Sequence, residues 1–131
     1  MPLDSPLRPS NVSVLIVDDA TAYRRAVRVL LEQRGYSIVG EADCVATALN
    51  YVKCLAPDAV LLDIHLPDGD GFDLTARIRD VRPEIAVLLT SSDFDRRFYA
   101  LAEAHGARGY VPKDQLSHVD FASFWSDANR T

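Results

Sequence analysis

Strand-like and helix-like segments alternate five times along this sequence, and this alternation restricts the possible folds more than any other feature. The strand-like segments are short apolar runs bounded by turn residues, over Val12–Val17, Tyr36–Glu41, Ala59–Asp63, Ile85–Leu89 and Gly109–Val111. Continuous apolar strands that are connected through helices form parallel sheets covered on both faces. The sequence therefore predicts an α/β fold, a doubly wound five-stranded parallel sheet with helices on both faces.

The segments between the strands repeat apolar residues at helical spacing and end near residues that stop helices. Helices are predicted from a capping Thr21 to Gly35, over Ala46–Leu55 before Pro57, over Phe72–Val81 before Pro83, over Asp95–His105 before Gly106, and over Ser117–Ala128. The last segment carries an apolar stripe made of Phe121, Phe124, Trp125 and Ala128. We expect this stripe to pack in the core, whereas an exposed part would mark a docking or homodimer surface.

Size and composition fit one ordinary globular domain. The chain has 131 residues, of which 48% are apolar and 25% are charged, and such a length buries a large core without disulfide or metal staples. Its net charge of −5 argues against direct contact with nucleic acid or with an anionic membrane. The arginines, Arg24 and Arg28 among them, are scattered along the chain, which indicates solvated helix faces.

The N-terminal residues and the cysteines indicate the cellular compartment of the protein. Residues 1–11 contain three prolines but no apolar block like that of a signal peptide, so they are predicted to be a flexible arm before a domain over residues 12–128. No run approaches the roughly 20 apolar residues that span a membrane. Cys44 and Cys54 lie ten residues apart without metal-binding spacing. This pattern favours a reducing compartment, and we expect a cytoplasmic protein.

Polar residues with useful chemistry stand at the C-terminal ends of the predicted strands. Asp18 and Asp19 follow the first strand, and Asp63 ends the third. Thr90 follows the fourth strand, and Lys113 lies just beyond the fifth. In a doubly wound sheet, ligands bind at this edge. We therefore expect the five side chains to form one site, although helix capping is a structural alternative for the two consecutive acids.

Carboxylates gathered at one edge would repel one another, and burial would raise their pKa values. A divalent cation that prefers oxygen ligands relieves this repulsion, and Mg²⁺ is the natural candidate because it binds one or two carboxylates and keeps waters that a phosphate can replace. Asp63 could then attack phosphorus while the metal and Lys113 neutralise charge and Thr90 donates a hydrogen bond. The product would be an aspartyl phosphate.

Further motifs surround these residues. The run Val60-Leu61-Leu62-Asp63-Ile64 is followed by the turn Leu66-Pro67-Asp68-Gly69-Asp70-Gly71, in which Gly69 and Gly71 are expected to supply backbone freedom. Tyr110 stands three residues before Lys113. With the acidic pair and Thr90, these motifs make the sequence resemble the receiver domain of bacterial two-component response regulators, the CheY-like superfamily, from Val12 to about Leu116.

The resemblance implies a flavodoxin-like fold and a signalling function. Asp63 would accept a phosphoryl group from a sensor histidine kinase or from a small phosphodonor. Mg²⁺ would be held by Asp18, Asp19, Asp63 and the backbone carbonyl of His65.

The resemblance also implies a conformational switch. Thr90 would move to bond the phosphoryl group, Tyr110 would turn inward into the space that this vacates, and Lys113 would bridge to Asp63 or to the phosphoryl group. The change would remodel a face made by the fourth helix, the fifth strand and the fifth helix, where a partner docks.

Two positions depart from the usual pattern of this family. Pro112 precedes Lys113, where many receivers have lysine followed by proline, and this leaves the loop geometry open. His65 stands two residues after Asp63, at a position that commonly holds a small polar residue or Met. Because His65 and Ser92 should flank the path of the hydrolytic water, we hypothesise that this pair sets the lifetime of the phosphate.

Two other functions stay open. A Mg²⁺-dependent phosphohydrolase that works through an aspartyl phosphate would need a general acid where this chain has His65, and a phosphorylation-independent scaffold would not need the intact site. We therefore expect no enzyme activity beyond self-phosphorylation and self-dephosphorylation. The 18 residues after Lys113 are too few for a DNA-binding domain. The chain either signals alone to a protein partner or belongs with an effector domain outside this sequence.

Overall fold

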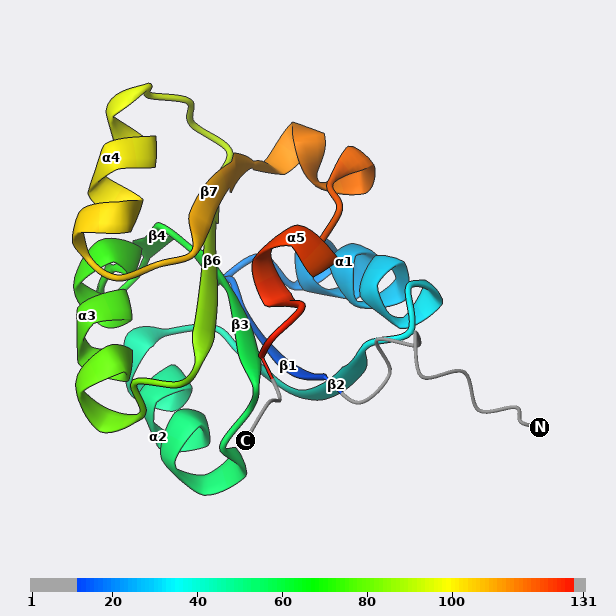
Figure 1. Ribbon diagram of the computed structural model, residues 1–131, viewed down its shortest axis with the longest axis horizontal. Coiled ribbons are helices and arrows are strands. Elements are labelled where there is room, and N and C mark those ends of the chain that lie inside the picture. The colour runs from blue at the N-terminus through cyan, green and yellow to red at the C-terminus, as the bar shows by residue number, and fades with distance from the viewer. Residues whose placement is uncertain (1–11, 129–131) are drawn as a thin grey trace.

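The central sheet has five strands, all parallel. The structure, a computed structural model, describes residues 12–128, so the arm predicted over residues 1–11 lies outside the described residues. The strands are β1 (Ser13–Val17), β2 (Ser37–Ala42), β3 (Ala59–Asp63), β6 (Ala86–Ser91) and β7 (Gly109–Pro112). They lie in the order β2-β1-β3-β6-β7 (Figure 1). The predicted α/β fold with a five-stranded parallel sheet is confirmed.

Helices cover both faces of the sheet. They are α1 (Thr21–Gln33), α2 (Val45–Leu55), α3 (Gly71–Val81), α4 (Arg97–Ala104), the 3-10 helix η2 (Lys113–His118) and the short α5 (Ala122–Trp125). Figure 1 shows α2, α3 and α4 on one side of the sheet and α1 with α5 on the other. Within residues 12–128, no helix has the length and apolar character needed to cross a membrane.

Each face of the sheet has its own apolar core because strand residues alternate between the two faces. Val60 and Leu62 of β3 pack with residues of α2, α3 and α4, whereas Ala59 and Leu61 pack with residues of α1 and α5. All five residues of β3 are buried. Burial on both faces explains why this strand is a continuous apolar run, and it places the Asp63 carboxylate at the buried end of that run.

Helix α1 begins differently from the prediction. The capping role expected of Thr21 is wrong, because Ala20 occupies the N-cap position and Thr21 is the first helical residue. Asp18 Oδ1 accepts a hydrogen bond from the Ala20 backbone N–H at 2.9 Å. Asp18 therefore fixes the turn between β1 and α1 with one oxygen and leaves the other, Oδ2, for different contacts.

The segment after β3 forms a small hairpin that the sequence did not predict. Its strands, β4 (His65–Leu66) and β5 (Gly69–Asp70), pair antiparallel. Asp68 Oδ1 accepts a hydrogen bond from the Val45 N–H at 2.7 Å at the start of α2, and Asp70 Oδ1 accepts one from the Asp73 N–H at 2.8 Å at the start of α3. Because carboxylates satisfy the free N–H groups of helix N-termini, the hairpin anchors both helices near the end of β3.

Gly71 is required for close packing rather than for a special backbone conformation. Among the glycines that the structure describes, positive φ angles occur at Gly35 and Gly106, so the backbone freedom expected at Gly69 and Gly71 is wrong as an explanation. A Cβ atom at Gly71 would lie 2.7 Å from the Asp63 carbonyl oxygen. Glycine therefore lets the start of α3 approach the end of β3.

The chain after β7 forms two short helices, so the single helix predicted over Ser117–Ala128 is wrong. Val119 is extended between η2 and α5. Arg34, the C-cap residue of α1, donates hydrogen bonds to the carbonyl oxygens of Ser117, at 2.7 Å, and Val119, at 2.6 Å. Asp120 accepts one from the Ala122 N–H at 3.1 Å. These bonds occupy groups that a continuous helix would have used, which interrupts it.

The apolar stripe of this segment packs mainly in the core, as expected. Phe121, Trp125 and Ala128 are buried, and Phe124 is partly buried. The rings of Phe121 and Trp125 are stacked 5.2 Å apart, and Tyr36 meets Trp125 edge-on at 5.3 Å. The remaining strands and helices match their predicted bounds within two residues.

Candidate functional site

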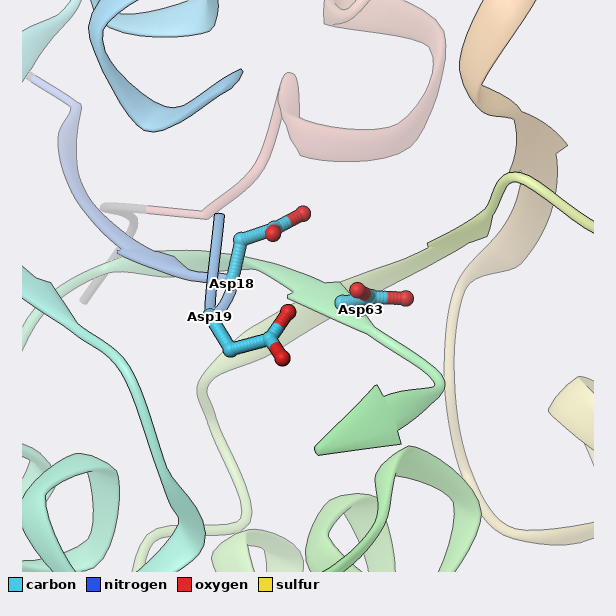
Figure 2. Close-up of side chains that lie close together, drawn as sticks. All are labelled: Asp18, Asp19 and Asp63. Carbon is cyan, nitrogen blue, oxygen red and sulfur yellow. The ribbon is translucent and has the colours of Figure 1, made fainter. Parts of the chain in front are cut away.

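Three acidic side chains meet at the C-terminal ends of two neighbouring strands. Asp18 and Asp19 follow β1, Asp63 ends β3, and the two strands are paired. Figure 2 shows the three side chains side by side, and carboxylate oxygens, one from each residue, lie within 4.8 Å of one another. Asp18 and Asp63 are only 1% and 5% exposed, whereas Asp19 is exposed. The structure thus gathers the three acids into one cluster.

Lys113 supplies the positive charge of this cluster. Its Nζ lies 2.7 Å from Asp18 Oδ2 and 3.3 Å from Asp63 Oδ2. The contact with Asp63 was expected, and the shorter one with Asp18 was not. Pro112, which closes β7, has φ −58° and ψ 145°. In this conformation the proline does not prevent the lysine from reaching the acids.

Burial and charge shift the pKa values of the cluster. Burial raises the pKa of Asp63 above its ordinary value, and the Asp18 carboxylate raises it further, while Lys113 acts in the opposite direction. Burial alone would lower the pKa of Lys113, but its two carboxylate partners outweigh that effect and hold the pKa above its ordinary value. Three carboxylates face one ammonium, and this excess of negative charge favours a cation.

Thr90 lies beside Asp63 on the neighbouring strand. The two residues are in register between β3 and β6, and Thr90 is 1% exposed. Its Oγ1 donates a hydrogen bond to the Val111 carbonyl at 2.7 Å. The hydroxyl is therefore within the site region but bonded to β7.

Tyr110 is a residue of β7 whose ring packs against α4, and it is 3% exposed. Its hydroxyl donates a hydrogen bond to the Asp93 carbonyl at 2.9 Å. The ring meets those of Phe98 and Tyr99 edge-on at centroid distances of 5.4 and 5.2 Å. The side chain is thus buried against α4 and connects β7 with the loop after β6.

His65 contacts the cluster through its backbone. Its N–H donates a hydrogen bond to Asp63 Oδ1 at 3.2 Å. The imidazole is exposed, and its Nε2 lies 3.2 Å from Asp93 Oδ2. Ser92 is exposed beyond the end of β6. The structure therefore gives His65 a partner, Asp93, that the sequence analysis did not identify.

Arg24 is a further residue of the site that was not predicted from the sequence. A solvated helix face was predicted for it, and that prediction is wrong. Its side chain is only 14% exposed. It donates hydrogen bonds to the Asp18 carbonyl at 2.6 Å and to Glu41 Oε1 at 3.1 Å. Arg24 therefore connects α1 and β2 to the backbone of the first acid. Its position five residues after Asp19, with an acid near the end of the next strand, is the signal that could have identified it.

The donor atoms of the cluster suit a hard divalent cation. Each of the three acids contributes a carboxylate oxygen, which is the ligand type that Mg²⁺ prefers. The exposed Asp19 leaves one side of the cluster open to water, and Mg²⁺ usually keeps several waters. The arrangement can therefore bind a divalent cation and, beside it, an anionic oxygen group.

Comparisons with known proteins agree with this geometry. The model of the response regulator receiver domain family matches residues 14–119. The signal receiver domain of the putative response regulator NarL from Mycobacterium tuberculosis superposes with a TM-score of 0.79 at 31% identity, over 92% of this chain and 98% of that one.

Curated relatives are longer proteins. A putative transcriptional regulator of Pseudomonas aeruginosa is 41% identical over 111 residues, which are 84% of this chain and 54% of the relative. The probable transcriptional regulatory protein NarL of Mycobacterium tuberculosis is 35% identical over 108 residues, 82% of this chain and 50% of the relative. The chain thus spans about half the length of these relatives. From its sheet order, its acidic cluster and these matches, we conclude that the chain belongs to the response regulator receiver domain family of two-component systems.

Proposed function

We propose that this chain is a phosphorylation-switched receiver that takes a phosphoryl group on Asp63 with the help of Mg²⁺. The observation that carries the proposal is the position of Lys113 Nζ, 3.3 Å from the buried Asp63 carboxylate and 2.7 Å from Asp18. A buried carboxylate beside other carboxylates is unfavourable unless a cation compensates its charge. The phosphodonor is a sensor histidine kinase or a small phosphorylated molecule.

In the proposed transfer, an Asp63 carboxylate oxygen forms a bond to phosphorus while the bond from phosphorus to the donor breaks. The electron pair of the broken bond leaves with the donor, and Lys113 neutralises charge on Asp63 or on the phosphoryl group. Mg²⁺ held by Asp18, Asp19, Asp63 and the backbone carbonyl of His65 would neutralise the phosphoryl oxygens. Water later attacks the aspartyl phosphate, which releases phosphate and restores Asp63.

The proposed switch runs from Thr90 to the surface of α4. Thr90 would exchange its hydrogen bond to the Val111 carbonyl for one to the phosphoryl group. Loss of this bond would free the backbone of β7 at Val111 and so allow the adjacent Tyr110 to move. The Tyr110 ring contacts Tyr99 of α4 at 5.2 Å. Phe94 and Tyr99 are 60% and 46% exposed, which suits a protein-docking face for a partner or a second copy.

Output from this domain is proposed to pass through protein contacts. The net charge of −5 does not favour direct contact with nucleic acid. The relatives described above are named transcriptional regulators and are about twice as long, so an effector domain outside this sequence is the other route. The proposal includes no catalysis beyond self-phosphorylation and self-dephosphorylation, and it places the protein in the cytoplasm.

Intact-mass spectrometry of the chain with Mg²⁺ and acetyl phosphate tests the proposal. We expect a gain of about 80 Da, one phosphoryl group, that disappears when EDTA replaces Mg²⁺ and in Asp63→Asn. Asp58→Asn is the matched control, because Asp58 precedes β3 at the opposite end and its carboxylate binds Ser13. This variant should still take up the group.

The outcomes separate three functions. An adduct on the wild type that lasts seconds or longer supports the switch. Release of many phosphates per chain without an adduct would instead support a phosphohydrolase. No response to acetyl phosphate or to beryllofluoride would support a scaffold and contradict the proposal.

A further inference from the structure

Tyr23, on the first turn of α1, contacts the catalytic cluster through its ring. The Lys113 ammonium lies over this ring, 4.1 Å from its centroid. This distance is well within the range of a cation–π interaction. Lys113 is therefore held from two sides, by the Asp18 and Asp63 carboxylates and by the face of Tyr23.

The hydroxyl of Tyr23 faces the same region. Its oxygen is buried and makes no hydrogen bond of good geometry within residues 12–128, although the Thr90 side chain lies close enough to influence it. Burial raises the pKa of this hydroxyl, and the Asp18 and Asp63 carboxylates raise it further, whereas the Thr90 side chain acts in the opposite direction. The raised pKa keeps the phenol neutral.

The shorter of the two carboxylate contacts of Lys113 is made to Asp18. Asp18 is also a proposed ligand of a divalent cation, and a bound cation would compete with the ammonium for Asp18 Oδ2. Lys113 would then keep the Tyr23 ring and Asp63 Oδ2, provided that the cation takes the other oxygen of Asp63. The ring offers no oxygen ligand, which is the type that Mg²⁺ prefers, so the metal does not displace the lysine from it.

Without the ring, the Lys113 side chain could adopt a different conformation. A groove of about 380 Å³ opens beside it, and Tyr23, Lys113 and Asp114 are among the residues that line it. Asp114, an exposed residue that also lines the groove, offers a competing negative charge. A lysine that turned toward Asp114 would leave Asp63 without its positive charge.

We propose that Tyr23 is a positioning residue for phosphoryl transfer, whose ring keeps the Lys113 ammonium beside Asp63 when a divalent cation engages Asp18. The proposal rests on the function proposed above, because it assigns Lys113 a role in transfer. It predicts that the ring, and not the hydroxyl, is the part of Tyr23 that matters.

NMR of protein labelled with ¹³C-lysine tests the ring contact directly. The chain has only two lysines, Lys53 and Lys113, and the exposed Lys53 serves as an internal reference. Protons over an aromatic face are shifted upfield, so the Hε signals of Lys113 should lie upfield of those of Lys53 with and without Mg²⁺. Tyr23→Phe should keep this shift, and Tyr23→Leu should lose it. A wild-type Lys113 signal that moves to the Lys53 position when Mg²⁺ is added would overturn the proposal.

Phosphorylation kinetics test the consequence. With saturating Mg²⁺ and acetyl phosphate, the Tyr23→Leu variant should be phosphorylated about fivefold more slowly than the wild type, and Tyr23→Phe should stay within about twofold of it. Tyr51→Leu, which removes a partly buried tyrosine on the other face of the sheet, is the matched control and should keep the wild-type rate.

The two experiments fail differently. Equal rates for Tyr23→Leu and the wild type, or equal losses in Tyr23→Leu and Tyr23→Phe, would overturn the positioning role of the ring. A wild type that takes no phosphate would instead overturn the proposed function, and the NMR result would still report on the contact.

Discussion

Asp63 carries an electrostatic penalty in the folded chain. It is 5% exposed at the end of a strand buried on both faces, and the Asp18 carboxylate lies in the same cluster. Both effects raise its pKa, although Lys113 opposes them. The residue that the proposed chemistry needs is therefore one that weakens the fold when no cation is bound.

Asp63→Asn should stabilise the metal-free domain by on the order of 1 kcal/mol at neutral pH. Because folding raises the pKa of Asp63, the stability that the residue contributes is complete below its ordinary pKa of 3.8 and is lost as the pH rises through the folded pKa. The advantage of the variant should thus grow as the pH rises above the ordinary pKa of 3.8. Urea unfolding in EDTA at several pH values measures it, and a variant less stable than the wild type at neutral pH would contradict this account.

His65 and Ser92 are proposed to set the lifetime of the phosphate. The imidazole Nε2 of His65 lies 3.2 Å from Asp93 Oδ2, and the His65 N–H donates a hydrogen bond to Asp63 Oδ1. We propose that the ring flanks the path of the hydrolytic water. His65→Asn should shorten the lifetime by about threefold, because a smaller side chain leaves more room for water. Asp93→Asn, which releases the ring, should act in the same direction. Phosphate release after removal of acetyl phosphate measures the rate, and a change of less than about twofold in His65→Asn would remove the hypothesis.

At the scale of elements, local patterns predicted the strands and most helices, while contacts between distant residues decided the rest. The five strands are local apolar runs, so their positions followed from the sequence. The cap on α2 comes from Asp68, 23 residues beyond Val45. Arg34 interrupts the last predicted helix from 83 and 85 residues away. Helical periodicity reports only on residues a few positions apart, so it could not have predicted these contacts.

Removal of the Asp68 cap should weaken α2 and the domain. The Asp68 pKa is lowered, first by its hydrogen bond from the Val45 N–H, so the stability it contributes is present above its ordinary pKa and is lost as the pH falls through the folded pKa. Asp68→Ala should therefore lower the melting temperature by a few degrees at neutral pH and by less in acid. The control Asp80→Ala removes an exposed acid near the end of α3. An equal melting temperature for Asp68→Ala and the wild type would show that the cap contributes nothing.

At the scale of the whole molecule, the site combines segments that are far apart in sequence. It joins the turn after β1, the ends of β3 and β6, and the residue after β7. The alternation of strands and helices predicted that these ends share one edge, but it did not predict the strand order β2-β1-β3-β6-β7. The pairing of Lys113 with Asp18 could not be predicted, because sequence position does not show which of several nearby acids a lysine contacts.

Mg²⁺ should stabilise the whole domain by binding the folded cluster and not the unfolded chain. At about 100 times its dissociation constant, the ion should raise the free energy of unfolding by about 2.7 kcal/mol. Urea unfolding in MgCl₂, compared with NaCl at equal ionic strength, measures the gain. Asp58→Asn should show the full gain and Asp63→Asn a much smaller one. An equal gain in Asp63→Asn would place the cation elsewhere.

The most direct test of the central claim is to locate the phosphoryl group on the chain. The protein is treated with acetyl phosphate and Mg²⁺, reduced with borohydride, which converts an aspartyl phosphate to homoserine, and mapped by peptide mass spectrometry. Our account predicts homoserine in place of Asp63 and at no other acid, and none when EDTA replaces Mg²⁺. Homoserine in place of Asp18 or Asp19, or a phosphorylated chain in which Asp63 stays intact, would contradict it.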